Sequence, residues 1–150
     1  MEIEEAMHVA IEHAKIAAIT SKDVPVGAVI LNANGDLIAT GNNQRELLND
    51  PTAHAEVVSI RHAAKELGNW RLDGCTIVVT LEPCVMCVGA IAQSRLSKVV
   101  FGAWDEKAGA SGSVWDILRD PRALHKVEVT SGVLAEECSA MLKEFFSEQR

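Results

Sequence analysis

The segment from Cys75 to Leu81 is an almost unbroken apolar run closely followed by Pro83, and it limits the folds that the chain can adopt. A strand that is apolar on both sides needs cover on both faces, which parallel strands flanked by helices provide. Val99 to Ala103 repeats the pattern, and Val127 to Thr130 is a further short strand. The sequence therefore predicts a sheet buried between helices.

The chain begins with a helical pattern that leads into a hairpin. Apolar residues recur every three or four positions over residues 3 to 20, which is typical of an amphipathic helix. Val26 to Leu31 and Leu37 to Thr40 flank the turn signal Asn34-Gly35, so we expect two paired strands there. We expect further helices over about residues 53–67, 83–94 and 114–119, and from 134 to the end of the chain.

This order of elements predicts one α/β domain over residues 1–150, with a mixed five-stranded sheet and helices on both faces. Hydrophobic residues make up 48% of the chain and charged residues 23%, which is ordinary for a folded globular protein. The acidic N-terminus and the lack of a long apolar run predict a cytoplasmic protein without a membrane span. In a reducing compartment, the four cysteines favour metal binding or burial over disulfides.

The net charge of −7 is unusual for a nucleic-acid binder, because phosphate contacts are usually made by a basic surface. Residues 85–126 are an exception within the chain, since they hold six basic and four acidic residues. Composition alone favours an unevenly charged, solvated surface as the meaning of this difference.

Two thiols three residues apart, Cys84 and Cys87, stand at the start of a predicted helix. The positive end of a helix dipole favours thiolates there, and this spacing allows both sulfurs to bind one zinc ion. His54 stands at the start of the preceding predicted helix and would give a third ligand. Three protein ligands leave one position for water, which is the arrangement of a catalytic zinc site.

The alternative is a closed structural site with Cys75 as its fourth ligand. An extended strand rises about 3.3 Å per residue, which places Cys75 roughly 25 Å from Cys84 and argues against that alternative. Cys138 is in helical phase with Leu134 and Met141, so we expect it to be buried. The remaining histidines lack a partner motif, and we expect them to be surface or hydrogen-bonded residues: His8, His13, His62 and His125.

Glu56 lies two residues after His54, and two roles are open to it. An acidic residue in a first helical turn stabilises the helix dipole. A carboxylate beside a metal-activated water can instead take a proton and pass it to a substrate. Its proximity to a candidate ligand favours the second role.

Several segments resemble the zinc-dependent nucleobase deaminases, and within them the bacterial tRNA adenosine deaminases. His-x-Glu followed by Pro-Cys-x-x-Cys is the signature of the larger class. The resemblance covers nearly the whole chain and is carried by Val24-Pro25-Val26-Gly27-Ala28-Val29, Pro51-Thr52-Ala53-His54-Ala55-Glu56, Thr80-Leu81-Glu82-Pro83-Cys84-Val85-Met86-Cys87, Phe101-Gly102-Ala103, Asp105, Lys107 and Gly109-Ala110-Ser111-Gly112-Ser113.

The resemblance implies a three-layer α/β/α fold like that of cytidine deaminase, with one Zn²⁺ per subunit. It also implies hydrolytic deamination of adenosine to inosine at the wobble position of an arginine tRNA, with the anticodon stem-loop as partner and a homodimer as the assembly. A single-stranded loop offers unstacked bases and needs few phosphate contacts, which suits an acidic chain.

The family's functional residues can be placed on matching positions. By resemblance, zinc is bound by His54, Cys84 and Cys87, and Glu56 carries the proton. The same resemblance implies contacts to the base or its neighbours from Asn43, Ala55, Val26, Pro83, Asp105, Lys107, Phe145, Phe146 and Arg150. Core packing is an equal alternative for the two phenylalanines. Gly27 would allow close approach of a base, although tight packing explains it equally well.

Two other functions remain open. A deaminase of free guanine or cytosine would share the zinc site, and a zinc-stabilised RNA-binding module would lack catalysis. The segment from Asp105 to Ser113 favours the tRNA enzyme by resemblance. Trp104 departs from the smaller or polar residue expected there, which puts the preference for flanking nucleotides in doubt.

Overall fold

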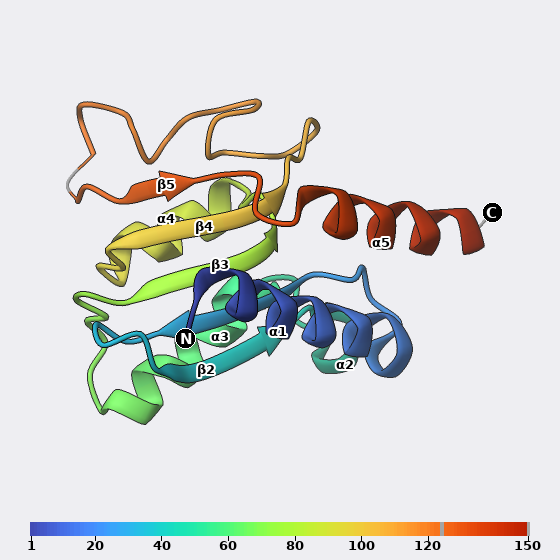
Figure 1. Ribbon diagram of the computed structural model, residues 1–150, viewed down its shortest axis with the longest axis horizontal. Coiled ribbons are helices and arrows are strands. Elements are labelled where there is room, and N and C mark those ends of the chain that lie inside the picture. Colours follow the sequence, from blue (N-terminus) through green and yellow to red (C-terminus); the bar gives the residue numbers. More distant parts are fainter. Residues whose placement is uncertain (124, 150) are drawn as a thin grey trace.

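The computed structural model describes residues 1–123 and 125–149, and it contains a central sheet with helices on both sides (Figure 1). The elements in chain order are α1 (Ile3–Ile16), a π-helical turn (Ala17–Ser21), β1 (Gly27–Leu31), β2 (Leu37–Asn42), α2 (Arg45–Leu48), α3 (Ala55–Leu67), β3 (Thr76–Leu81), α4 (Val85–Gln93), β4 (Lys98–Ala103), β5 (Glu128–Thr130) and α5 (Ala135–Glu148).

The sheet has five strands in the order β2-β1-β3-β4-β5. β1 pairs antiparallel with β2 and with β3, whereas β3, β4 and β5 run parallel. The predicted mixed sheet is therefore confirmed. Because β3 and β4 are parallel, the segments that follow them leave the sheet at the same edge, and these segments include Cys84 and Asp105.

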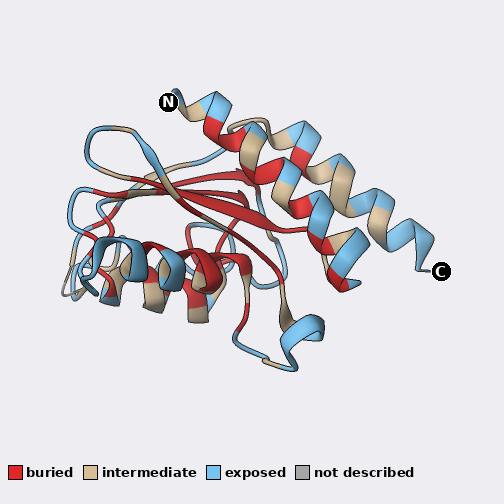
Figure 2. Cartoon of the chain, turned by 90° about the horizontal axis from the view of Figure 1, so that it is seen from below, coloured by how far each residue is buried: buried red, intermediate tan, exposed pale blue. Residues whose placement is uncertain are grey.

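Helices cover both faces of the sheet (Figure 2). α1 and α5 pack on one face, where Met7 and Ile11 meet Val29, Val78 and Val100. α3 and α4 cover the other face, and their buried residues join a second cluster built from the opposite sides of the same strands. The alternation of side chains along each strand thus fills both layers, as the continuous apolar runs predict.

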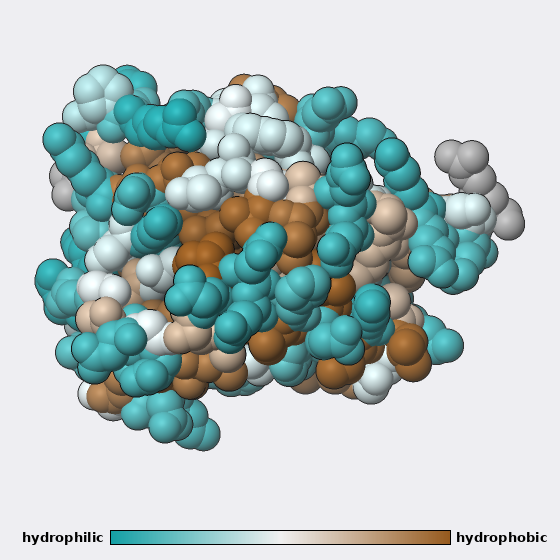
Figure 3. All heavy atoms as spheres, in the orientation of Figure 1, coloured by the Kyte–Doolittle hydropathy of each residue, from teal (hydrophilic) through white to brown (hydrophobic). Residues whose placement is uncertain are grey.

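The two faces also differ at the surface. In Figure 3 hydrophilic side chains cover much of α1 and α5, and apolar side chains show through the centre of this face. A groove between the two helices is lined by apolar Ile11, Ile19, Met141 and Phe145, with acidic residues of α5 at its rim. Within the described part of the chain, no helix has the length and apolar character needed to cross a bilayer.

Cys138 fixes α5 to the sheet. It is the one fully buried residue of that helix within the described chain. It can approach β4 closely because Gly102 has no side chain: a Cβ at Gly102 would lie 2.5 Å from the Cys138 sulfur. The predicted burial of Cys138 is confirmed.

The predicted helix over residues 114–119 is wrong. The segment forms turns and an isolated bridge between Ser111 and Asp116. Its backbone N–H groups bond to earlier parts of the same loop: Trp115 donates to the Gly109 carbonyl and Ile117 to the Ala110 carbonyl. These bonds take the place of the hydrogen bonds of a helix, and local periodicity in the sequence does not encode them.

Gly41 brings α3 against β2. A Cβ at Gly41 would lie 2.6 Å from the Ala55 carbonyl oxygen and 2.7 Å from the Ser59 nitrogen. The absence of a side chain at this position therefore sets the distance between the sheet and the first turn of α3. Gly27 has the same role under α1, since a Cβ there would overlap the Ala10 carbonyl. Of the two explanations for Gly27, tight packing is the one that the structure supports.

We predict that Gly41→Ala lowers the free energy of unfolding by about 1–3 kcal/mol, because the added methyl group meets rigid helix backbone. Gly89→Ala is the matched control, since nothing lies within 4 Å of a Cβ at Gly89. Removing a glycine from α4 should raise stability by about 0.5–1 kcal/mol. Urea denaturation measures both values, and equal effects of the two substitutions would contradict this account of the packing.

Candidate metal centre and active site

Two helix N-termini meet at the edge of the sheet and carry the candidate ligands. His54 is the N-cap residue of α3, and Cys84 is the N-cap residue of α4. Both have extended backbone conformations, with φ/ψ of −70°/154° and −79°/178°. Cys87 follows in the first turn of α4, so the segments before the helices and one helical turn place three ligand side chains together.

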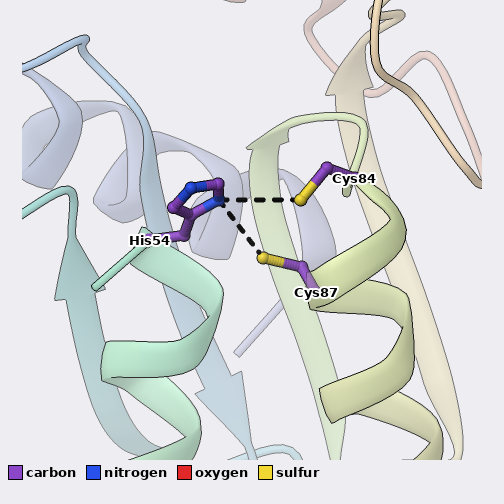
Figure 4. Close-up of side chains that lie close together, drawn as sticks. All are labelled: His54, Cys84 and Cys87. Carbon is purple, nitrogen blue, oxygen red and sulfur yellow. Dashed lines mark hydrogen bonds between the residues drawn. The ribbon is translucent and has the colours of Figure 1, made fainter. Parts of the chain in front are cut away.

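The three side chains converge on one point (Figure 4). His54 Nδ1 lies 3.7 Å from the Cys84 sulfur and 3.5 Å from the Cys87 sulfur. Zinc–nitrogen bonds of about 2.0–2.1 Å and zinc–sulfur bonds of about 2.3 Å place two tetrahedral ligand atoms roughly 3.6 Å apart. One nitrogen and two sulfurs at these separations fit a zinc ion, and they leave a fourth position that these residues do not fill.

The structure contradicts the alternative of Cys75 as a fourth ligand, and it agrees with the expected hydrogen bonding of two other histidines. Among the described residues, His54, Cys84 and Cys87 form the only group of three or more potential ligands whose donor atoms lie within 4.8 Å of one another. Cys75 is buried at the opposite end of β3. His62 and His125 bond to the carbonyl oxygens of Thr40 and Leu96. Three protein ligands are the set found in catalytic zinc sites.

The site favours a charged thiol at Cys84. Hydrogen bonding from Cys87 lowers the pKa of Cys84 to about 3, and contact with His54 adds to this effect although burial opposes it. The pKa of Cys87 is raised by the hydrogen bond to Cys84 and by burial. The pKa of His54 is raised mainly by its contact with Cys84. A thiolate is the form that binds metal, so the lowered pKa makes Cys84 suitable as a candidate ligand.

Glu56 points into the same site from the first turn of α3. It is buried, and this burial raises the pKa of its carboxyl to about 7. Glu56 lines a pocket of about 160 Å³ together with His54 and Cys84. A buried carboxyl in a pocket is poorly suited to stabilise a helix dipole through solvent, whereas a pKa near neutrality suits transfer of a proton.

The pocket contains part of the predicted substrate-binding set. Val26, Asn43 and Asp105 line it. Asn43 uses its amide on the protein itself, because its oxygen accepts from the Ala55 N–H at 2.9 Å and its nitrogen donates to the Val24 carbonyl at 2.9 Å. Asn43 therefore holds the start of α3 against the segment before β1.

The other predicted contacts lie outside this pocket. Pro83 is buried, and its carbonyl accepts from the Ala110 N–H. Lys107 and Phe146 line a separate hollow on α5, whereas Phe145 lines the groove between α1 and α5. Phe146 is 50% exposed, so the alternative of core packing is wrong for it. Arg150 lies outside the described residues.

The sequence analysis does not predict two buried carboxylates near the site. Asp23 binds Arg45 at 2.6 Å and accepts from the Glu46 N–H at the start of α2, a short helix that was not predicted. Glu82 accepts from three backbone N–H groups of the loop after β4. Glu82 lies beside Pro83 and Cys84 in the family motif, which points to a role for it, whereas no sequence pattern marks Asp23.

Comparisons with known proteins agree with this site. Residues 1–103 match the cytidine and deoxycytidylate deaminase zinc-binding region. The chain belongs to this family of zinc-binding deaminases. It is thus a hydrolytic deaminase, and its His/Cys/Cys group corresponds to the zinc chemistry of the family.

Comparisons with individual proteins add detail to the family match. The deaminase is 51% identical over 144 residues to the tRNA-specific adenosine deaminase of Bacillus subtilis, covering 96% of this chain and 88% of that protein. It resembles a structure solved in work on A-to-I editing by tRNA:A34 deaminases at the wobble position, with a TM-score of 0.88 and 39% identity over 92% of this chain and 99% of the other. The guanine deaminase of Nitrosomonas europaea is more distant, with a TM-score of 0.79 and 28% identity over 96% and 84% of the two chains.

We predict that His54→Ala, Cys84→Ala and Cys87→Ala each reduce the zinc content of the purified deaminase from about one to well below one ion per chain, because each removes one of three ligands. Cys75→Ala is the matched control and should keep its zinc. Elemental analysis after dialysis measures the content. Zinc loss in the Cys75 variant would contradict the three-ligand assignment.

A second prediction concerns Asp23, whose side chain is fully buried beside Arg45. Burial opposes its ionisation, but hydrogen bonds from Arg45 and from the N–H groups of Glu46 and Val24 outweigh this effect, so the pKa lies below its ordinary 3.8. The ionised form therefore stabilises the fold. This contribution is complete above the unfolded-state pKa and is lost as the pH falls through the lower folded-state value.

We expect Asp23→Asn to lower the free energy of unfolding by about 1–3 kcal/mol at pH 7. The difference from the unsubstituted protein should shrink as the pH falls below 3.8. Urea denaturation between pH 7 and pH 3 measures it, with the exposed Asp36→Asn as control. A difference that stayed constant down to pH 3 would show that charge on Asp23 contributes nothing.

Proposed function

We propose that this deaminase converts adenosine to inosine at the wobble position of a tRNA, with an arginine tRNA as the first substrate to test. The observation that carries the proposal is a three-ligand metal site with an open corner that shares a pocket with a buried carboxyl group. The similarity to a tRNA-specific adenosine deaminase over 96% of the chain supports tRNA as the substrate.

The chain's own groups supply binding and proton transfer. His54, Cys84 and Cys87 would hold Zn²⁺, which when bound lowers the pKa of water and so provides a nucleophile at neutral pH. Glu56 would accept a proton from water and deliver it first to the purine ring and then to the departing ammonia. Its pKa of about 7 allows the carboxyl group to accept and release a proton near neutral pH.

Residues around the pocket would hold the base. Val26 forms an apolar part of the wall, and Asn43 joins that wall to the start of α3. Because the Asn43 amide bonds to the backbone at Ala55 and Val24, a change at this residue alters the shape of the pocket as well as any contact to a base. Pro83 and Ala55 contribute through the backbone they position.

The surface beside the pocket suits single-stranded RNA. Asp105 lies in the pocket wall, and Lys107 shares a hollow with the exposed ring of Phe146 and with Lys143. An unstacked base can stack on an aromatic ring while a lysine approaches its phosphate. An anticodon loop therefore requires only a small basic area, which agrees with a net charge of −7.

We also propose that two chains associate and that the protein acts in the cytoplasm. Exposed apolar side chains on α4 and on residues 114–117 support association, since soluble proteins seldom leave such groups together in water. Ile117 from that segment lines a hollow with Val88 and Ala92 of α4. Other exposed apolar residues of these two segments are Val85, Val114 and Trp115.

Deamination of a free base is the second candidate, favoured by the likeness to a guanine deaminase. Incubating the purified protein with an arginine tRNA, with guanine and with cytosine separates the two. We expect inosine in the tRNA, detected by sequencing. An unedited wobble adenosine together with turnover of a free base would reverse the assignment.

We predict that Glu56→Gln lowers the rate of inosine formation by about 100-fold or more, because general acid–base catalysis contributes about 10²–10⁴. Zinc content should remain unchanged, since Glu56 is not a proposed ligand. Glu66→Gln, an exposed change on the same helix, should retain full activity. Full activity of the Glu56 variant would remove the proton-carrying role.

A further inference from the structure

Glu82 is a buried carboxylate that the proposed chemistry does not use. It connects the end of β3 to Pro83 and the candidate ligand Cys84, and the residue is 2% exposed. No lysine, arginine or histidine of the described chain forms an ion pair with it. A buried charge without a counter-ion requires hydrogen-bond donors.

Backbone N–H groups of a single loop provide those donors. Glu82 Oε1 accepts from the Asp105 N–H at 2.9 Å, and Oε2 accepts from the N–H groups of Ser111 and Ser113 at 2.9 and 3.1 Å. The loop also approaches the carboxylate too closely for a side chain at Gly109, because a Cβ there would overlap Glu82. Residues 105–113, which we call the substrate loop, thus fold around one carboxylate.

Bonds within the substrate loop transmit this anchoring to its exposed residues. The Asp105 carboxylate accepts from the N–H groups of Lys107 and Ala108 at 3.0 and 3.1 Å. The Ser113 hydroxyl donates to the Asp105 carbonyl at 2.8 Å. The positions of Asp105 and Lys107 therefore depend on the Glu82 bond to the Asp105 N–H.

The same stretch of chain joins the substrate loop to the metal centre. The Ala110 N–H donates to the Pro83 carbonyl at 2.8 Å, and Gly109 forms a bridge with Cys84. Glu82 itself lines the pocket that contains His54 and Glu56, together with Asp105 and Ala108 of the loop. Glu82 therefore fixes the loop relative to the pocket from the residue two positions before a ligand.

We propose that Glu82 is a positioning residue that shapes the substrate loop for the nucleotides flanking the target base, and that it takes no part in the deamination step. This inference rests on the proposed function for the identity of the substrate. It predicts that loss of the Glu82 charge weakens recognition of the RNA loop while the zinc site and the proton carrier stay in place.

Glu82→Gln tests the inference, because the amide keeps the size of the side chain but presents N–H groups to one of its backbone donors. An anticodon stem-loop is the substrate, and a panel of stem-loops varies the bases beside the target. We expect unchanged zinc content, kcat within about threefold of the original, a KM raised about tenfold or more, and weaker discrimination among the flanking bases.

Val100→Ala controls for a general loss of stability, since Val100 is buried under α1 and α5 away from the loop. Hydrogen exchange of the Ser111 and Ser113 amides should speed up in the Glu82 variant and remain slow in the Val100 variant. Gly109→Ala is a second route to the same effect, because its methyl group displaces the carboxylate. It should reproduce the rise in KM if Glu82→Gln fails to fold.

Two outcomes would overturn the inference. One is a fall in kcat with KM unchanged, which would place Glu82 in the chemistry. The other is a response to the flanking-base panel no different from that of Val100→Ala, which would make Glu82 only structural. Failure of the proposed function is distinguishable from both, because the unsubstituted protein would then form no inosine in any stem-loop.

Discussion

The convergence of two helix N-termini at one edge of the sheet determines what this protein can do. α3 places His54 and Glu56, and α4 places Cys84 and Cys87, so neither helix forms the site alone. Their separation depends on backbone packing, since α3 rests on β2 through Gly41. A change of packing far from the ligands would therefore alter the distances between nitrogen and sulfur on which metal binding depends.

The buried carboxyl groups around the site differ in the number of hydrogen-bond donors that surround them. Glu82 and Asp23 are charged acceptors surrounded by donors, and each ties two chain segments together. Among the described residues no comparable set of backbone donors surrounds Glu56, and burial raises its pKa to about 7. A buried carboxyl group is thus structural where N–H groups surround it and suited to proton transfer where they do not.

The sequence predicted most of the sheet and the three side chains that could hold a metal ion, because apolar runs mark the strands and the motifs around His54 and around Pro83-Cys84 with Cys87 mark those side chains. The sequence did not predict local structure that depends on hydrogen bonds between residues far apart in the chain. Residues 114–119 have a helical pattern, but their N–H groups bond back to Gly109 and Ala110. α2 begins where Asp23, more than twenty residues earlier, accepts the Glu46 N–H. The exposure of Phe146 likewise depends on how far α5 extends past the sheet (Figure 1), and the periodicity of apolar residues does not predict that length.

Cys138 is the one fully buried residue of α5 among those that the structure describes, so a small rotation of the helix about this residue would move its far end the most. Cys138 is seated on Gly102 near the start of the helix, and Phe146 lies eight residues further on, which at 1.5 Å per residue is about 12 Å away. A tilt of about 10° around the anchor would move the Phe146 ring by roughly 2 Å. Small adjustments beneath Cys138 would thus be magnified at the exposed Phe146 ring.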